Sequence, residues 1–333
     1  MITRDQIAKR AGVSTGTVSN ILNGKQNVSE KSVEKVRRAI KELGYIPDQN
    51  ARSLAGKTNR HIGIAIYEYE NPYHWEIIRG IEEYAASKGY FVSEFLLDNK
   101  NLCKYDEICG RKLGALVNFM TNEYPDGFLD VLRIQNVKLV NFDSSVGPVF
   151  SMDYTRSFEE IFRKLSEDGH QKVGYVWSGD ELRFNADGRG KLFYELRRRY
   201  GMDLSADLVE YNYDSRLLSY DIGYRGCKNL IARHGDLTAL FTTNDLVAIG
   251  AIRALKDEGK SVPEDVCVVG CDDIKVASNY IPSITSMGFD KHRFGVNIAR
   301  CIIDGEPTDP SEYVVSPEAV FRESTMKKEK VKI

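Results

Sequence analysis

Between residues 62 and 273 the chain contains eight short runs rich in β-branched and aromatic residues, arranged in two sets of four. The first set is IGIAIYE, FVSEFLL, GALVNFM and VKLVNFD, and the second is KVGYVWS, LVEYNY, ALFTTND and CVVGCDD. Helical patterns separate the runs, for example from Trp75 to Lys88 and from Asp245 to Glu258. Strands that alternate with helices are typical of βαβ units and parallel sheets. The pattern therefore predicts an α/β body of two doubly wound lobes.

Polar residues follow several of these runs. In open parallel sheets, ligands bind beyond the carboxyl ends of the strands. Two lobes that face each other through these edges would form a cleft for a small molecule. Each polar residue could instead only cap the helix that follows it. The residues at these strand ends are Asp143, Ser178, Asn244, Asp245, Asp272 and Asp273.

The first 22 residues carry signals for two short helices. Thr3 and Gln6 have the spacing of a capping box, and Gly12 can end the helix that follows. Ser14 can then cap a second helix that runs to Leu22. Two short helices across a tight glycine turn indicate a helix-turn-helix. The second helix has an apolar inner face, which leaves an outer face of Thr15, Gly16, Thr17, Ser19 and Asn20.

A third helix is predicted from Ser29 to a stop at Gly44. Its apolar residues recur at spacings of three and four, so they form one stripe that completes a three-helix core: Val33, Val36, Ile40 and Leu43. The small polar face of the second helix is then left to enter a DNA major groove, which is about 12 Å wide. Phosphate contacts are expected from Lys9, Lys25, Lys31, Lys35, Arg37 and Arg38.

The formal net charge of −2 hides an uneven distribution. Residues 1–60 contain 12 lysines and arginines against 5 aspartates and glutamates, a net charge of +7; the other residues contain 34 against 43, a net charge of −9. Residues 1–60 thus form a basic head and the remainder an acidic body. This distribution indicates that the head binds a polyanion. A solvated basic surface without a partner is the alternative.

Other classes of protein lack support in the sequence. The first residues lack the apolar run of a signal peptide and no window reaches about 18 apolar residues, so we expect a cytoplasmic protein without a membrane span. The six cysteines form no C-x-x-C pair, which favours buried thiols over disulfides or zinc. The segment SGDELRFNADGRG lacks the spacing of a phosphate-binding loop. We therefore expect no enzyme activity, metal or cofactor.

The head resembles a known family. The segments AGVSTGTVSNILN, VSEKSVEKVRRAIKELGYIPDQNA and LAGK resemble the DNA-binding segment of the lactose/galactose/purine repressor family. The resemblance implies that Thr15, Gly16 and Asn20 stand at base-reading positions, although Gly16 has no side chain to read with. The full set of expected DNA contacts is Thr15, Gly16, Thr17, Asn20, Ser29, Asn50, Leu54 and Ala55.

The segment IPDQNARSLAGKTNR, residues 46–60, is predicted to be a conditional helix. Asp48 can cap it and Gly56 can end it, but it is shorter than the roughly 12 to 15 residues that an isolated helix needs in water. We expect it to fold when two copies meet on DNA. The resemblance implies a hinge helix whose Leu54 enters the minor groove, where an apolar wedge kinks the duplex. Leu54 could alternatively pack against the body as an anchor.

The resemblance extends through NPYHWEIIRGIEEYAASKGY, EDGHQKVGYVWSG and TALFTTNDLVAIGAIRALKDEGKSVPEDVCVVGCDDI to nearly the whole chain. It implies the fold of periplasmic sugar-binding proteins, with crossovers near residues 155–160, 284–289 and 317–322, and a homodimer whose cleft binds an effector. The terminal FRESTMKKEKVKI lacks leucine heptads, which favours a dimer over a tetramer. The expected parts are a DNA-binding domain, 1–46; a hinge, 47–60; an N-terminal lobe, 61–157 plus 288–318; and a C-terminal lobe, 158–287 plus 319–333.

The family's effector positions fall on Tyr73, His74, Asp153, Arg183, Asn185, Arg189, Leu218, Asn244, Asp272 and Phe289. Arg183 could be a surface charge and His74 an ordinary half-buried histidine, and Tyr220 could replace Leu218 as the stacking residue. Carboxylates and an arginine suit a polyhydroxyl ligand, so a sugar is the leading effector class. A purine or a phosphosugar acting as corepressor is the alternative. A plain binding protein and a single-lobed phosphosugar sensor fit the basic head and the two sets of strands less well.

Overall fold

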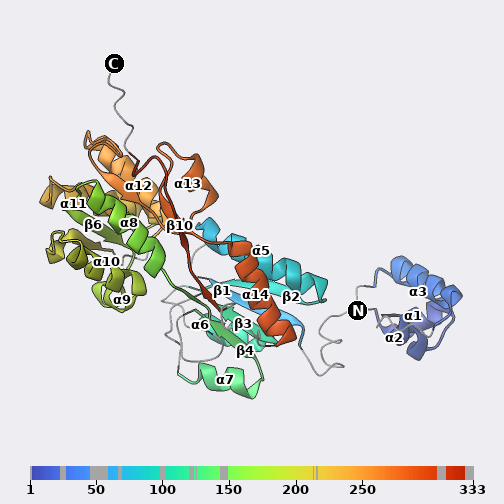
Figure 1. The fold of residues 1–333 in the computed structure, drawn as a ribbon. Coiled ribbons are helices and arrows are strands. Elements are labelled where there is room, and N and C mark those ends of the chain that lie inside the picture. The colour runs from blue at the N-terminus through green and yellow to red at the C-terminus, as the bar shows by residue number, and fades with distance from the viewer. Residues whose placement is uncertain are drawn as a thin grey trace. The chain divides into compact units, whose positions relative to one another are not determined.

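The computed structural model describes residues 2–22, 28–45, 59–66, 70–97, 103–119, 124, 126–142, 149–212, 214, 217–305 and 313–326. The chain divides into two compact units, Met1–Asn59 and Arg60–Ile333 (Figure 1). We refer to the first unit as the head and to the second as the body. The predicted hinge residues Asn50, Leu54 and Ala55, the strand-end residue Asp143 and the basic residue Lys25 lie outside the described residues.

The head contains the three predicted helices. Thr3 forms a capping box with Gln6, and Gly12 ends the first helix in the left-handed region at φ 66°. Ser29 accepts a hydrogen bond from the backbone of Ser32, so it caps the third helix. The helices are α1 (Arg4–Ala11), α2 (Thr15–Leu22) and α3 (Glu30–Leu43).

The head has a small apolar core. Ile7 of α1, Val18 of α2 and Val36 of α3 are fully buried. Val33 was predicted to belong to this core, but it is only half-buried and lies outside the cluster, whereas Ala39 lies inside it. The small methyl group of Ala39 was not recognised as part of the stripe because the prediction followed the large apolar residues.

The first lobe of the body is built on a parallel sheet in the order β2-β1-β3-β4. One face is covered by α5 and α14, and the other by α6 and α7. The strands are β1 (His61–Ile66), β2 (Phe91–Leu96), β3 (Ala115–Asn118) and β4 (Lys138–Asn141). The helices are α5 (Pro72–Ser87), α6 (Cys103–Gly110), α7 (Phe128–Ile134) and α14 (Lys291–Asp304).

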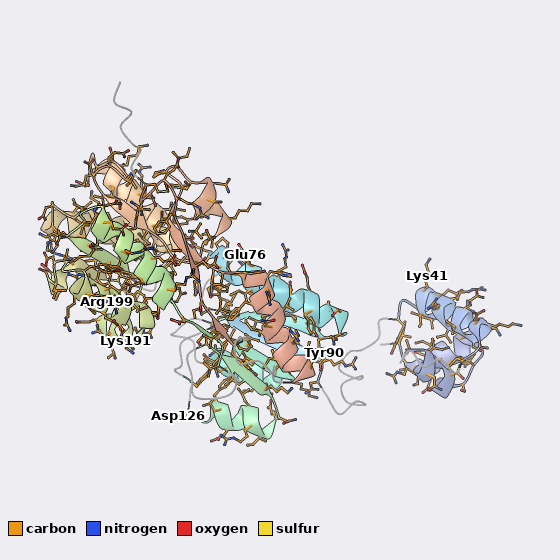
Figure 2. All side chains as sticks on the ribbon, viewed as in Figure 1. Lys41, Glu76, Tyr90, Asp126, Lys191 and Arg199 are labelled. Carbon is orange, nitrogen blue, oxygen red and sulfur yellow. The ribbon has the colours of Figure 1, made fainter. Side chains whose placement is uncertain are left out.

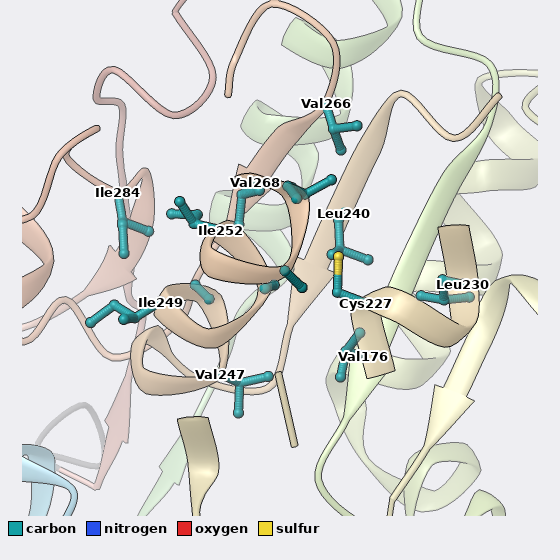
Figure 3. Close-up of a cluster of buried hydrophobic side chains, with 14 of the residues drawn as sticks. Val176, Cys227, Leu230, Leu240, Val247, Ile249, Ile252, Val266, Val268 and Ile284 are labelled. Atoms are coloured by element: carbon teal, nitrogen blue, oxygen red, sulfur yellow. The ribbon is translucent and has the colours of Figure 1, made fainter. Parts of the chain in front are cut away.

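The second lobe repeats this plan with a parallel sheet in the order β7-β6-β8-β9. Figure 3 shows apolar side chains of α11 and α12 packed with those of the strands on one face. The strands are β6 (Val173–Trp177), β7 (Val209–Tyr211), β8 (Ala239–Thr242) and β9 (Cys267–Val269). The helices are α8 (Thr155–Glu167), α9 (Glu181–Ala186), α10 (Gly188–Arg199), the 3-10 helix Ala206–Leu208, α11 (Ser219–Arg233), α12 (Asp245–Asp257) and α13 (Lys275–Asn279). The eight strands predicted from the sequence are thus all present.

The lobes are linked by chain segments that pass from one to the other. Met287 packs in the second lobe, whereas Phe289, two residues later, packs in the first. Two short strand pairs accompany these passages, one parallel and one antiparallel. They join β5 (Ser151–Met152) with β11 (Val314–Val315) and β10 (Ser286–Gly288) with β12 (Glu318–Val320).

Glycines allow one pair of helices in each lobe to pack at backbone distance. In the first lobe, Gly80 of α5 lies against the carbonyl oxygen of His292 on α14. In the second lobe, Gly250 of α12 lies against the carbonyl oxygen of Tyr220 on α11. A Cβ atom at either glycine would overlap that oxygen, so these positions require glycine.

Candidate functional site

The outer face of α2 carries the residues predicted to meet DNA bases. Thr15 and Gly16 are exposed, and Thr17 and Asn20 are half-buried, while Val18 points into the core. Ser14 Oγ accepts from the backbone N–H of Thr17 at 3.1 Å, which confirms Ser14 as the cap of this helix. The cap fixes where α2 begins and therefore which side chains face outward.

Several basic side chains are exposed on the surface of the head. Figure 2 shows Lys41 projecting from α3. The predicted phosphate-contacting residues within the described range are all exposed, namely Lys9, Lys31, Lys35, Arg37 and Arg38. Ser29, which was also predicted to touch DNA, holds the N-terminus of α3 through its hydroxyl oxygen. These groups give the head the donors and positive charges that a duplex backbone requires.

Arg189 is the centre of the candidate site in the body. It lies near the start of α10, its side chain is 16% exposed, and it binds the Asp187 carboxylate through Nε at 3.1 Å and through a terminal nitrogen at 3.0 Å. Its other terminal nitrogen donates to the carbonyl oxygen of Thr243, just beyond β8, at 3.1 Å. The guanidinium carbon lies 4.9 Å from the ring centre of Trp177 and 5.5 Å from that of Tyr154. Strand ends of the second lobe therefore fix this cation, as expected for an α/β site.

Asp187 and Arg189 each shift the pKa of the other. Burial by itself lowers the pKa of Arg189, but the neighbouring Asp187 carboxylate holds that pKa well above its ordinary value. Burial raises the pKa of Asp187, and the Arg189 charge more than compensates, so the pKa of Asp187 is lowered. Both groups are therefore charged at neutral pH and together form a nearly neutral pair.

Asp272 connects the two lobes. It follows β9, and its Oδ2 accepts a hydrogen bond of 3.0 Å from Nδ2 of Asn71, the cap of α5 in the first lobe. Burial raises the pKa of Asp272 to about 6. Its backbone has φ 101°, which is unusual for a residue other than glycine. This strained backbone is consistent with a functional position.

Two neighbours, Lys291 and Asp245, hold the loop of Asp272 in place. Lys291, the first residue of α14, donates from Nζ to the carbonyl oxygen of Asp272 at 2.7 Å. Asp245 is fully buried and accepts from the backbone N–H of Ile274 at 2.8 Å and from the hydroxyl of Ser286 at 2.6 Å. Burial raises the pKa of Asp245 well above its ordinary value. Asp245 was read from the sequence as a strand-end residue, and the structure gives it this supporting position.

Aromatic residues of the first lobe lie beside this region. The rings of Tyr73 and Phe289 meet edge to face, with centres 6.1 Å apart. His74 is buried, with its ring 5.4 Å from that of Phe119, and burial lowers the pKa of His74 to about 4. His74 is therefore neutral at pH 7. Tyr73, His74 and Phe289 therefore form one group of ring contacts, in which Tyr73 contacts both other rings.

The remaining predicted effector residues have local contacts. Asp153 is exposed and accepts from both the backbone and the hydroxyl of Thr155. Asn244 caps α12 by accepting from the backbone of Val247 at 2.9 Å, which is the capping role considered as its alternative. Nε of Arg183 lies 3.9 Å from Oδ2 of Asp180. Asn185 and Leu218 are exposed.

Several residues around Arg189 and Asp272 were not predicted from the sequence. Asn71 was passed over as part of the NPYH loop, although an Asn-Pro pair is a recognisable helix start. Asp187 stands two residues before Arg189, and that spacing could have suggested the ion pair. Tyr154, Trp177 and Lys291 carry no local signal, because folding alone brings them to Arg189 and Asp272.

Within the described ranges, no group of three or more histidine, cysteine, aspartate and glutamate residues is arranged to hold a metal ion. None of the helices described is long and apolar enough to cross a membrane. Among the described cysteines, four are buried and Cys109 is half-buried.

The head and body define a class of protein, in which a helix-turn-helix precedes a two-lobed body with a polar site at its strand ends. Residues 3–48 match the family of bacterial regulatory proteins of the lacI type, and residues 162–325 match a periplasmic binding protein-like domain. The chain is 31% identical to the HTH-type transcriptional repressor PurR of Mannheimia succiniciproducens, over 98% of this chain and 99% of that protein. The chain therefore belongs to the lacI family of bacterial regulatory proteins.

Other relatives and solved structures agree with this assignment. The HTH-type transcriptional regulator CelR of Thermobifida fusca is 28% identical, with 97% of this chain and 98% of that protein covered. The lac repressor dimer bound to operator and the anti-inducer ONPF has a TM-score of 0.75 at 26% identity, covering 98% of this chain and 99% of that chain. The complex of the transcriptional regulator CelR with cellobiose has a TM-score of 0.68 at 26% identity, covering 97% and 100%.

Proposed function

We propose that the chain is a sequence-specific transcriptional repressor. Two copies bind a pseudo-palindromic operator in double-stranded DNA as a homodimer, and a small effector in the cleft of each body controls them. The single observation that carries this proposal is the capped α2, which presents a small polar face on a basic head. The lac repressor dimer bound to operator, which shares the fold at 26% identity, supports it. A bacterial repressor must be in the same compartment as its operator. We therefore expect a cytoplasmic protein that is associated with the nucleoid when it is bound to the operator.

The proposed control is allosteric. The effector changes the angle between the lobes, and this change alters the spacing of the two hinges that lead to the heads. Coupling free energies of this kind are typically about 1 to 3 kcal/mol. An effector that prefers the released state induces, and one that prefers the DNA-bound state corepresses. The proposed lobes are residues 61–157 with 288–318 and residues 158–287 with 319–333, and the packing of Phe289 in the first lobe supports the second crossover.

The leading effector class is a neutral, polyhydroxylated sugar. Asp187 already neutralises Arg189, so an anionic ligand gains little from this arginine and meets the carboxylates of Asp187 and Asp272 as well. Hydroxyl groups suit such a site, because each can donate to a carboxylate while it accepts from Asn71 or Arg189. The complex of the similar transcriptional regulator CelR with cellobiose is consistent with this class.

A purine acting as corepressor is the second candidate. The edge-to-face pair of Tyr73 and Phe289 beside the site offers apolar surface to a flat ring. The similarity to the transcriptional repressor PurR, at 31% identity, supports this candidate. The proposed effector contacts are those predicted from the sequence, together with Asn71, Asp187, Tyr154 and Trp177. No catalytic role is proposed for any of them.

A thermal-shift screen of sugars and nucleobases tests the effector class, since a ligand that binds only the folded protein raises its melting temperature. A neutral sugar should raise that temperature in the parent and not in Arg189→Ala. A response to a purine or a phosphosugar alone would contradict the sugar assignment. Turnover of any of these compounds by the pure protein would contradict the proposal of a regulator without enzyme activity.

A further inference from the structure

An acidic residue of α1 contacts the first residue of α2 on the outer surface of the head. The hydroxyl of Thr15 donates to Oδ1 of Asp5 at 2.8 Å, and both residues are exposed. The tight turn at Gly12 brings the start of α1 beside the start of α2. Asp5 also lies in the first turn of α1, where the helix dipole favours a negative charge. The carboxylate is therefore held beside Thr15 by the fold of the head.

The direction of this hydrogen bond follows from the chemistry of the two groups. A threonine hydroxyl has one proton and two lone pairs, and a carboxylate can only accept. The proton of Thr15 must therefore point to Asp5. Ser14 precedes Thr15 in the chain, but its hydroxyl lies 2.9 Å from the hydroxyl of Thr17 and caps the helix. Toward a ligand, Thr15 presents lone pairs and its methyl group.

We infer that Asp5 determines which base Thr15 prefers. It does so by accepting the one hydrogen bond that the Thr15 hydroxyl can donate. This inference rests on the proposed DNA-binding function. In the major groove, adenine presents an amino group at N6 and cytosine one at N4, whereas guanine presents the acceptors N7 and O6. A hydroxyl that can only accept selects adenine or cytosine and rejects guanine. Asp5 is thus a positioning residue for specificity, although it need not touch a base.

The charge of Asp5 has a separate effect, which the test must distinguish from its effect on Thr15. A carboxylate on the DNA-facing surface repels phosphates, so Asp5→Ala should tighten binding to every duplex regardless of sequence. Glu34→Ala is the matched control, because Glu34 is an exposed acid on α3 of the same head. Its removal should change affinity without changing base preference.

The experiment is a selection of operators from a randomised duplex library with the full-length protein at low salt. The variants are Asp5→Ala, Thr15→Val, the double variant Asp5→Ala/Thr15→Val, and Glu34→Ala. In the parent, one base position in each half-site should show adenine or cytosine with guanine depleted. In Asp5→Ala, guanine should rise at that position by about fivefold, in keeping with one hydrogen bond to a base edge. All other positions should keep the parent's preference.

The double variant decides whether Asp5 acts through Thr15. Valine has the shape of threonine without the hydroxyl, so Asp5→Ala should no longer alter the preference in the Thr15→Val background. Guanine that stays as depleted in Asp5→Ala as in the parent overturns the inference. A shift that persists in the Thr15→Val background also overturns it, because Asp5 would then meet the base itself. If the parent protein binds no duplex from the library, that result overturns the proposed function and therefore also this inference.

Discussion

Asn71, the cap of α5, and Asp272, which follows β9, are 201 residues apart in the chain and form a hydrogen bond of 3.0 Å between the two lobes. Any movement that separated the lobes at this point would break this hydrogen bond. Burial raises the pKa of Asp272 to about 6, so the carboxyl group binds its proton more tightly in the folded state than in the unfolded one.

The first prediction concerns pH and stability. Because the folded-state pKa of Asp272 is raised, its contribution to stability is fully present below pH 4 and is lost as pH rises to about 6. Asp272→Asn removes this loss and keeps an oxygen to accept from Asn71. The variant should therefore gain stability relative to the parent between pH 4 and pH 6, by up to about 3 kcal/mol. Urea unfolding at several pH values measures the difference, and an equal difference at pH 4 and pH 7 would contradict it.

The second prediction concerns the glycines between helices. Gly80→Ala and Gly250→Ala each place a Cβ atom on a carbonyl oxygen of the neighbouring helix, so the helices must move apart. We expect each substitution to lower the free energy of unfolding by about 2 kcal/mol or more. Gly110→Ala is the control, because a Cβ atom there meets no atom within 4 Å. Chemical denaturation of all three variants checks the ranking, which fails if Gly110→Ala is the most harmful.

The third prediction concerns Arg189. Its replacement by alanine removes the proposed effector contact and leaves the Asp187 carboxylate without its ion-pair partner. Arg189→Ala should lose the effector response while its affinity for operator stays close to that of the parent. The double variant Asp187→Asn/Arg189→Ala should be more stable than Arg189→Ala, because asparagine removes the unpaired charge and keeps a side-chain oxygen to cap α10. Fluorescence anisotropy of labelled operator, with and without the sugar found by thermal shift, gives the response, and a retained response would exclude this role.

The fourth prediction concerns Leu54, which lies outside the described residues. If Leu54 enters the minor groove as a wedge, Leu54→Ala should weaken operator binding and reduce the bend of the DNA. A gel assay of bend angle, made alongside an affinity measurement, tests both effects. Equal affinity and equal bend in parent and variant would favour the alternative of an anchor packed on the body.

The sequence predicted the elements of the fold well because their signals are local. The strands, the capping box at Thr3 and the stop at Gly44 depend on residues close together in the chain. The hydrogen bond between Asn71 and Asp272 joins residues from different lobes, and no repeating pattern in the sequence predicts it. For Asn244, a strand-end position and a helix cap give the same sequence pattern, and only the contact with Val247 identified the cap.

The central claim is that the head binds duplex DNA through its basic residues, and the salt dependence of that binding tests it most directly. The dimer should lose affinity linearly on a logarithmic plot as salt rises, by at least about 10³-fold between 50 and 200 mM, since each neutralised phosphate releases counterions. A slope near zero, or no binding at low salt, would contradict the claim and leave a ligand-binding protein without a DNA partner.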